Sequence, residues 1–287
     1  MGISLSSARF LIGEMRRGVD FSKTLTLGRQ GLYMQRNQYK VVCSLLNVQA
    51  PRQATFADEF FAGLGAKSLD VLDASSYEGA GLTHDLNSPL PTAFRKKWSC
   101  VIDGGTLEHV FNFPEAIKTC MELVEKGGHL ILITPWNNWA GHGFYQFSPE
   151  LFYRLLSADN GFLLERMLIH QDGKWFSIKD PDSLGMRVEG NGSQPTQLFI
   201  SAKKLKTVPI FSQWPQQSDY SKAWIAMSPP SAQSEASGES INNHFLEQFP
   251  ILENIQTTWR NLKEGRIQKH RKTVWSQAVP QKNGIPL

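Results

Sequence analysis

Short apolar runs and amphipathic segments alternate along the chain from about residue 7 to residue 205. Most of the apolar runs are rich in Leu, Ile and Val, and several stop at an aspartate or a glycine. Such alternation of strand-like and helix-like segments is typical of an α/β protein built on a parallel sheet. The pattern predicts strands at 23–28, 68–73, 81–85, 99–103, 129–134, 162–170 and 197–205. The helices that it predicts are 7–17, 39–46, 56–66, 112–126 and 148–158.

Two local patterns refine this picture. The run "HLILIT" at 129–134 is the most apolar, which predicts a central place in the sheet. The helix before it begins at Asn112, carries an apolar stripe that reaches Val124, and is predicted to end at Gly127-Gly128. The last two strands are separated by a long insert and can pair as an antiparallel hairpin.

The composition divides the chain into three parts. Residues 1–206 hold the alternating pattern and are predicted to form one α/β domain. Residues 207–243 are rich in Pro, Ser and Gln and predict a linker or an arm draped over the surface. Helical spacing returns in 244–287, which we expect to form a basic helical extension that packs on the core or on a second subunit.

Charge and cysteine content narrow the class of protein. A net charge of +4 is too weak to indicate a nucleic-acid partner. The basic run "RIQKHRK" is either a solvated helix face or a contact for an acidic lipid surface, a phosphorylated substrate or nucleic acid. Three cysteines without metal-ligand spacing indicate free, mostly buried thiols in a reducing compartment. No apolar run approaches the length of a membrane span, so we expect a cytoplasmic protein. Homo-oligomerisation is left open.

The residues that follow the predicted strands form a pattern of their own. Three of four strand ends carry an aspartate, and small residues accompany them. In an open parallel sheet, ligands bind outside the carboxyl ends of the strands, where a carboxylate can accept hydrogen bonds from ribose hydroxyls or an adenine amine. For a single aspartate, a helix cap or a turn is the better interpretation, whereas the set in this order favours a ligand site. The residues at these ends are Gly28-Arg29-Gln30, Asp73-Ala74-Ser75, Asp85-Leu86 and Asp103-Gly104-Gly105.

The stretch "CVIDGGTLEHVFNFPEAI", followed by "ELVEKGGHLILITP", resembles the class I S-adenosylmethionine-dependent methyltransferases. The resemblance covers residues 20 to 205. It implies a Rossmann-like α/β sheet that is mostly parallel, with an antiparallel edge strand and helices on both faces. It also implies S-adenosylmethionine as cofactor. Asp73 would hold its ribose, Asp85 with the Leu86 backbone its adenine, and Asp103 with Gly104 and Gly105 its methionine part.

The first loop departs from this family. The usual Gly-x-Gly-x-Gly is replaced by "LGRQGLYM", in which Arg29 and Gln30 stand for small residues. In one interpretation Gly28 makes the turn, and Arg29 or Gln30 contacts the carboxylate of the cofactor. In the other, the chain keeps the fold as a scaffold and binds no cofactor.

The candidate catalytic residues follow the strands 99–103 and 129–134. His109 is a candidate general base, or a residue that orients its loop, and His142 between two glycines is the second candidate. Glu108, Trp136, Tyr145 and Gln146 are candidate substrate-binding residues, although aromatic side chains often serve only as core. No metal-ligand spacing is found, and no metal is predicted.

The segment "GHGFYQFSPELFYRLL" resembles the substrate-side region of members that act in polysaccharide or secondary-metabolite pathways. Together these resemblances imply methylation of a small molecule or a glycan precursor, on a hydroxyl (O-methylation) in preference to an amine. The competing hypothesis is a catalytically inactive interaction protein of the same fold with a degenerate first loop.

Overall fold

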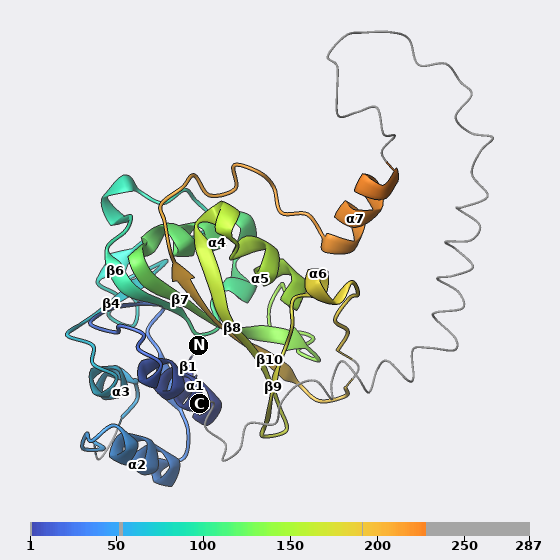
Figure 1. Ribbon diagram of the computed structural model, residues 1–287. Coiled ribbons are helices and arrows are strands. Elements are labelled where there is room, and N and C mark those ends of the chain that lie inside the picture. Colours follow the sequence, from blue (N-terminus) through green and yellow to red (C-terminus); the bar gives the residue numbers. More distant parts are fainter. Residues whose placement is uncertain (1, 52–53, 191, 228–287) are drawn as a thin grey trace, which may run out of the picture.

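The computed structural model describes residues 2–51, 54–190 and 192–227 of the 287-residue chain. Its centre is an eight-stranded sheet in the order β5-β4-β2-β6-β7-β10-β8-β9 (Figure 1). The strands are β2 (Lys23–Leu27), β4 (Ser68–Asp73), β5 (Leu82–Thr83), β6 (Trp98–Asp103), β7 (Val124–Asn137), β8 (Phe162–Gln171), β9 (Lys174–Ser177) and β10 (Thr196–Lys204).

The direction of the strands confirms the predicted fold class. The pairs β5–β4, β4–β2, β2–β6 and β6–β7 are parallel. Strand β10 lies antiparallel between β7 and β8, and β9 is an antiparallel edge strand. The predicted pairing of the last two long strands is thus confirmed, but the antiparallel strand β10 is internal. The sheet is thus mostly parallel and Rossmann-like, and the strand order reverses between β2 and β6.

Helices cover both faces of the sheet, as predicted. On one face α1 (Leu5–Arg16), α2 (Arg36–Leu45) and α3 (Asp58–Gly63) share a core cluster that includes Ile131 and Ile133 of β7. On the other face α4 (Phe113–Leu123) and α5 (Pro149–Leu155) pack with Leu130 and Leu132. Side chains of a strand alternate between faces, so the continuous run "HLILIT" fills both cores. It lies in the interior of the sheet, which confirms the central position predicted for it.

The end of α4 differs from the prediction. The helix stops at Leu123, and β7 begins at Val124 with a register shift against β6. Gly127 has a φ of 88°, and a Cβ at Gly128 would lie 2.7 Å from the Ser99 carbonyl oxygen. The two glycines therefore shape the start of the strand and do not end the helix.

Several short elements were not predicted from the sequence. They are β1 (Gly2–Ser4) and β3 (Gly31–Tyr33), which pair in parallel as a second small sheet, and β9 and α6 (Pro181–Leu184) in the insert between β8 and β10. The predicted strand 81–85 is also shorter, since only Leu82 and Thr83 pair with β4. Elements of two to four residues are too short to show a hydrophobic period.

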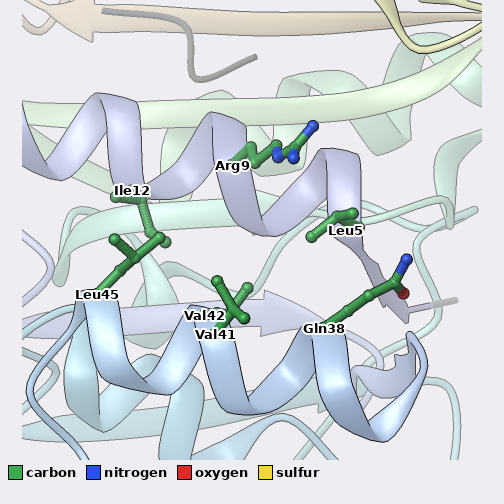
Figure 2. A pocket seen from close by; sticks show the side chains of 7 residues that line it. All are labelled: Leu5, Arg9, Ile12, Gln38, Val41, Val42 and Leu45. Atoms are coloured by element: carbon green, nitrogen blue, oxygen red, sulfur yellow. The ribbon is translucent and has the colours of Figure 1, made fainter. Parts of the chain in front are cut away.

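A groove of about 390 Å³ lies between α1 and α2 (Figure 2). It is mostly apolar, with Val41 and Leu45 on its exposed side. It contains none of the predicted site residues. Its lining consists of Leu5, Arg9, Ile12, Gln38, Val41, Val42 and Leu45.

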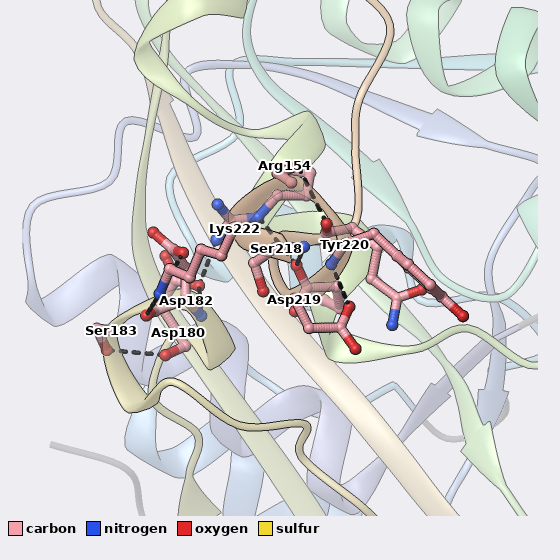
Figure 3. A network of polar contacts seen from close by, with 11 residues as sticks. Arg154, Asp180, Asp182, Ser183, Ser218, Asp219, Tyr220 and Lys222 are labelled. Carbon is pink, nitrogen blue, oxygen red and sulfur yellow. Dashed lines mark hydrogen bonds and ion pairs between the residues drawn. The ribbon is translucent and has the colours of Figure 1, made fainter. Parts of the chain in front are cut away.

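The segment predicted as a linker or arm contains a further helix, α7 (Ser218–Met227). Polar contacts hold α7 on α5 and on the insert (Figure 3). The Ser218 backbone N–H donates to Glu150, Asp219 pairs with Arg187, and Lys222 pairs with Asp182. The predicted basic extension, 244–287, lies outside the described residues.

Two simpler predictions can also be compared with the structure. Cys43, Cys100 and Cys120 are free and buried, as predicted. Among the described residues, no helix is both long enough and apolar enough to span a bilayer.

Candidate functional site

The strand order brings the predicted strand-end residues into one row. In the register of the sheet, Leu27 of β2 lies beside both Leu72 of β4 and Asp103 of β6. Asp73 ends β4 and lies beside Thr83 of β5. The residues that follow β5, β4, β2 and β6 therefore line the same edge of the sheet, and the reversal point lies between β2 and β6.

Gln30 lies at this reversal point. Its side chain is buried, and Nε2 donates to the carbonyl oxygens of Leu27 and Gly28 at 2.9 and 3.1 Å. The side chain rests against Gly104, where a Cβ would come within 2.2 Å of Gln30 Oε1. Oε1 itself has no hydrogen-bond partner. Gln30 thus closes the first loop and leaves one unused acceptor beside Gly104.

The guanidinium of Arg29 is held by other residues of the chain. Its Nη2 lies 2.5 Å from Asp58 Oδ2, and the guanidinium stacks over Phe56 at 4.1 Å from the ring centroid. Nη1 also donates to the Glu78 carbonyl oxygen at 3.2 Å. Asp58, which the sequence analysis did not single out, therefore holds the residue that was predicted to contact the cofactor carboxylate.

The residues after β4 and β5 form turns. Asp73 is half-buried, and its Oδ1 accepts from the Ala74 backbone N–H, while Ser75 Oγ accepts from the Tyr77 backbone N–H. Asp85 is exposed. Its Oδ1 accepts from both the backbone and the side chain of Asn87, and the backbone bond leads the effects that lower the pKa of this carboxyl. Leu86 is buried in the core cluster on the α4 face.

Asp103 is fully buried at the end of β6. Its Oδ1 accepts from the Thr106 backbone N–H at 2.7 Å, and its Oδ2 has no hydrogen-bond partner. Burial raises the pKa of Asp103. Gly105 has a φ of 101°, which lets the chain turn tightly around the carboxylate. Thr106, which also bonds the Leu27 carbonyl oxygen, was not singled out from the sequence.

Glu108, His109 and His142 come together, although residue 142 is far from the other two in sequence. Glu108 lies in a short 3-10 turn (Leu107–His109) and is 1% exposed. His142 Nε2 lies 3.5 Å from Glu108 Oε1, and the two imidazole rings are 5.2 Å apart. Burial, followed by the charge of His142, lowers the pKa of His109. Burial, followed by the charge of Asp103, raises the pKa of Glu108.

The candidate substrate-binding residues after β7 take different positions. Tyr145 stacks with Phe147 and donates through its hydroxyl to the Phe111 carbonyl oxygen at 2.7 Å. Gln146 is exposed, and its Oε1 accepts from the backbone of Trp139. Trp136 is half-buried against the core cluster. Tyr145 and Gln146 therefore support the loop that carries His142.

The N-terminal strand reaches the same edge of the sheet. The Gly2 backbone N–H donates to the Gly104 carbonyl oxygen at 3.4 Å. Gly2 packs so closely on the ring of Tyr33 that a Cβ would lie 2.1 Å from it. Strand β1 therefore borders the reversal point, and no local sequence signal indicated this.

Comparison with known proteins finds matches among solved structures only. No family model matches the sequence, and no curated protein matches it significantly. The branched-chain polyamine synthase of Thermus thermophilus, solved with N4-aminopropylspermidine and 5'-methylthioadenosine, is 15% identical with a TM-score of 0.38, over 75% of this chain and 61% of that chain.

Two further solved structures are similar at the same level. The trans-methyltransferase CalH, solved with SAH, is 15% identical with a TM-score of 0.41, over 70% of this chain and 57% of that chain. A candidate S-adenosylmethionine-dependent methyltransferase of Listeria monocytogenes is 14% identical with a TM-score of 0.37, over 68% of this chain and 98% of that chain. This chain thus spans less than two thirds of the synthase and of CalH. At such TM-scores the chain's own residues must carry any proposal about function.

Proposed function

We propose that this protein is an S-adenosylmethionine-dependent methyltransferase that acts on a hydroxyl group of a small molecule or glycan precursor. The observation that carries the proposal lies at the reversal point between β2 and β6. There two buried acceptors, Gln30 Oε1 and Asp103 Oδ2, lack hydrogen-bond partners. Buried polar atoms normally have partners, and a pair of unused acceptors favours a ligand that carries donors and positive charge. S-adenosylmethionine carries both an ammonium and a sulfonium group.

The remaining strand ends suit the rest of this cofactor. Asp73 stands one strand away from the reversal point, where a carboxylate can accept from two ribose hydroxyls. Asp85 and Leu86 follow β5, the next strand along this edge, where we place the adenine. Gly105 has a φ of 101° and lets the backbone turn beside the methionine part, while the space beside Gly104 is filled by the Gln30 side chain.

Methyl transfer from a sulfonium is an in-line displacement. The bond between sulfur and the methyl carbon breaks as the oxygen–carbon bond forms, and the sulfonium becomes a neutral thioether. The chain's main task is to align the acceptor with the methyl group, which is worth on the order of 7–11 kcal/mol. The hydroxyl proton must pass to a base, and His109 or His142 is the candidate because the two imidazoles lie together beyond the end of β6.

Calorimetry with S-adenosylhomocysteine tests the proposal. The full-length chain should bind one equivalent saturably. Asp73→Asn should weaken the affinity by about tenfold or more, because a charge-assisted hydrogen bond is replaced. Asp159→Asn, on an exposed turn, is the matched control and should bind as the unaltered protein does. Absence of heat at high protein concentration would count decisively against the cofactor.

A second candidate function is an inactive interaction protein of this fold. It is favoured by Arg29, which is bound to Asp58, and by the N-terminal strand, which borders Gly104. Under this hypothesis the calorimetric titration is silent, and Arg29→Ala does not restore binding. Saturable binding of S-adenosylhomocysteine would exclude it.

A further inference from the structure

Three side chains with metal-binding atoms meet beside the turn that follows β6. Among the described residues, Glu108, His109 and His142 form the one group of three or more His, Cys, Asp or Glu side chains whose donor atoms all lie within 4.8 Å of one another. We propose that these three residues bind one divalent transition-metal ion of the zinc type.

The distances suit such an ion. With metal–ligand bonds of about 2.1 Å in tetrahedral geometry, neighbouring ligand atoms are about 3.4 Å apart. Glu108 Oε1 and His142 Nε2 are already 3.5 Å apart. The donor atoms of the group lie within 4.8 Å of one another, and the ring of His109 is exposed, so a change of at most about 1.4 Å brings its nitrogen to the same separation.

One oxygen of the buried Glu108 carboxylate has no hydrogen-bond partner in the structure. Its side chain is 1% exposed, and its Oε2 makes no hydrogen bond. An isolated buried carboxylate is costly, whereas one that coordinates a cation is common. Glu108 Oε1 faces His142, and an ion between the two side chains would replace their direct contact, while the second carboxylate oxygen is unused.

The backbone of Glu108 also fixes the loop that delivers His142. Its carbonyl oxygen accepts from the backbone N–H groups of Phe144 and Tyr145 at 2.8 and 3.2 Å. At Gly143 a Cβ would lie 2.8 Å from that oxygen, so only glycine permits this approach. One residue therefore contributes a ligand and also positions the loop that carries the second ligand. This arrangement is typical of a preorganised site.

The ligand set indicates the kind of metal. Two imidazoles and one carboxylate suit zinc and similar transition metals, while magnesium and calcium prefer oxygen ligands. Three protein ligands leave a fourth position open, which is typical of catalytic sites and not of structural sites. His142 is 45% exposed, so this open position is accessible to a small molecule.

The consequence for the acceptor rests on the proposed function. If both imidazoles hold the metal, neither can serve as the base considered above. A hydroxyl in the open position would then lose its proton to solvent water, and the metal would stabilise the alkoxide. The acceptor class is then an alcohol or a phenol. Metal binding itself does not depend on methyl transfer and can be measured without cofactor.

The test uses the full-length chain, freed of metal with a chelator that is then removed by dialysis. Titration with Co²⁺ is followed by visible absorption, and titration with Zn²⁺ by calorimetry. The expected result is one saturable equivalent, with d–d bands of tetrahedral intensity. Glu108→Gln and His142→Gln should each weaken binding by about tenfold or more. His84→Gln, which lies outside the group, is the matched control and should bind as the unaltered protein does.

Two outcomes would overturn the proposal. The first is the absence of a saturable site in a chain that the far-UV circular dichroism spectrum shows to be folded. The second is an affinity that Glu108→Gln and His142→Gln both leave unchanged, which would place the metal elsewhere. Binding of S-adenosylhomocysteine is measured in parallel with chelator present. A chain that binds the cofactor but no metal contradicts this inference alone, and one that binds metal but no cofactor contradicts the proposed function alone.

Discussion

Gly104→Ala offers a direct test of the packing at the reversal point. The added Cβ would lie 2.2 Å from Gln30 Oε1 and 2.9 Å from its Cδ, well inside normal contact. The Gln30 side chain would have to leave a buried position and give up its hydrogen bonds to Leu27 and Gly28. Each such bond contributes roughly 1 kcal/mol, so we expect a loss of about 2–3 kcal/mol in the free energy of unfolding.

A double-mutant cycle isolates this contact. Urea denaturation of the unaltered protein, Gly104→Ala, Gln30→Ala and the double variant gives the coupling free energy. In the Gln30→Ala background the clashing atoms are absent, so the additional cost of Gly104→Ala should fall below about 0.5 kcal/mol. Gly81→Ala is the matched control, because no heavy atom lies within 4 Å of the added Cβ. Equal costs of Gly104→Ala in both backgrounds would refute the packing argument.

Two other predictions concern stability outside the site. Burial lowers the pKa of Lys204 to about 8 from 10.5. Between these pH values the unfolded chain holds a proton that the folded chain has released. The free energy of unfolding therefore rises with pH, by at most ~1.4 kcal/mol per pH unit. Lys204→Met lacks this gain, and its stability should fall further below that of the unaltered protein between pH 8 and pH 10 in urea denaturation. Lys203→Met, next to it on β10, is the matched control. Asp219→Ala removes the ion pair with Arg187, worth ~1 kcal/mol or less, and should speed proteolytic cleavage within α7 up to about fivefold. The exposed Asp159→Ala should leave that rate unchanged.

The sequence allowed much of the sheet to be predicted. Runs such as "SCVID" and "HLILIT" are buried, and the aspartate or glycine that ends a run marks its carboxyl end, so the row of strand-end residues follows from the local pattern. Hydrophobic pattern works here because it records which side chains leave water. Prediction from this pattern is less reliable where a residue contacts another that is distant in the sequence. Lys204 donates to the carbonyl oxygens of Met121 and Val124, at the observed end of α4. The local pattern had instead predicted that this helix ends at Gly127-Gly128.

The candidate site was also predictable from the sequence only in part. The positions of Asp73, Asp85 and Asp103 at strand ends followed from local pattern together with the rule for parallel sheets. The meeting of Glu108 with His142 did not, because it depends on a loop that is held by a single carbonyl oxygen. The engagement of Arg29 by Asp58 and the buried side chain of Gln30 also depend on residues distant in the chain.

Local hydrophobicity thus specified most strands, most helices and the edge of the sheet where acids gather. Tertiary structure alone decided which of those acids keep an unused oxygen and which are taken up by turns. It also decided which histidine joins Glu108. The physical reason is that burial is a property of each residue and its immediate neighbours, whereas a hydrogen-bond partner or a fellow ligand is chosen by loops and strand crossings that bring distant residues together.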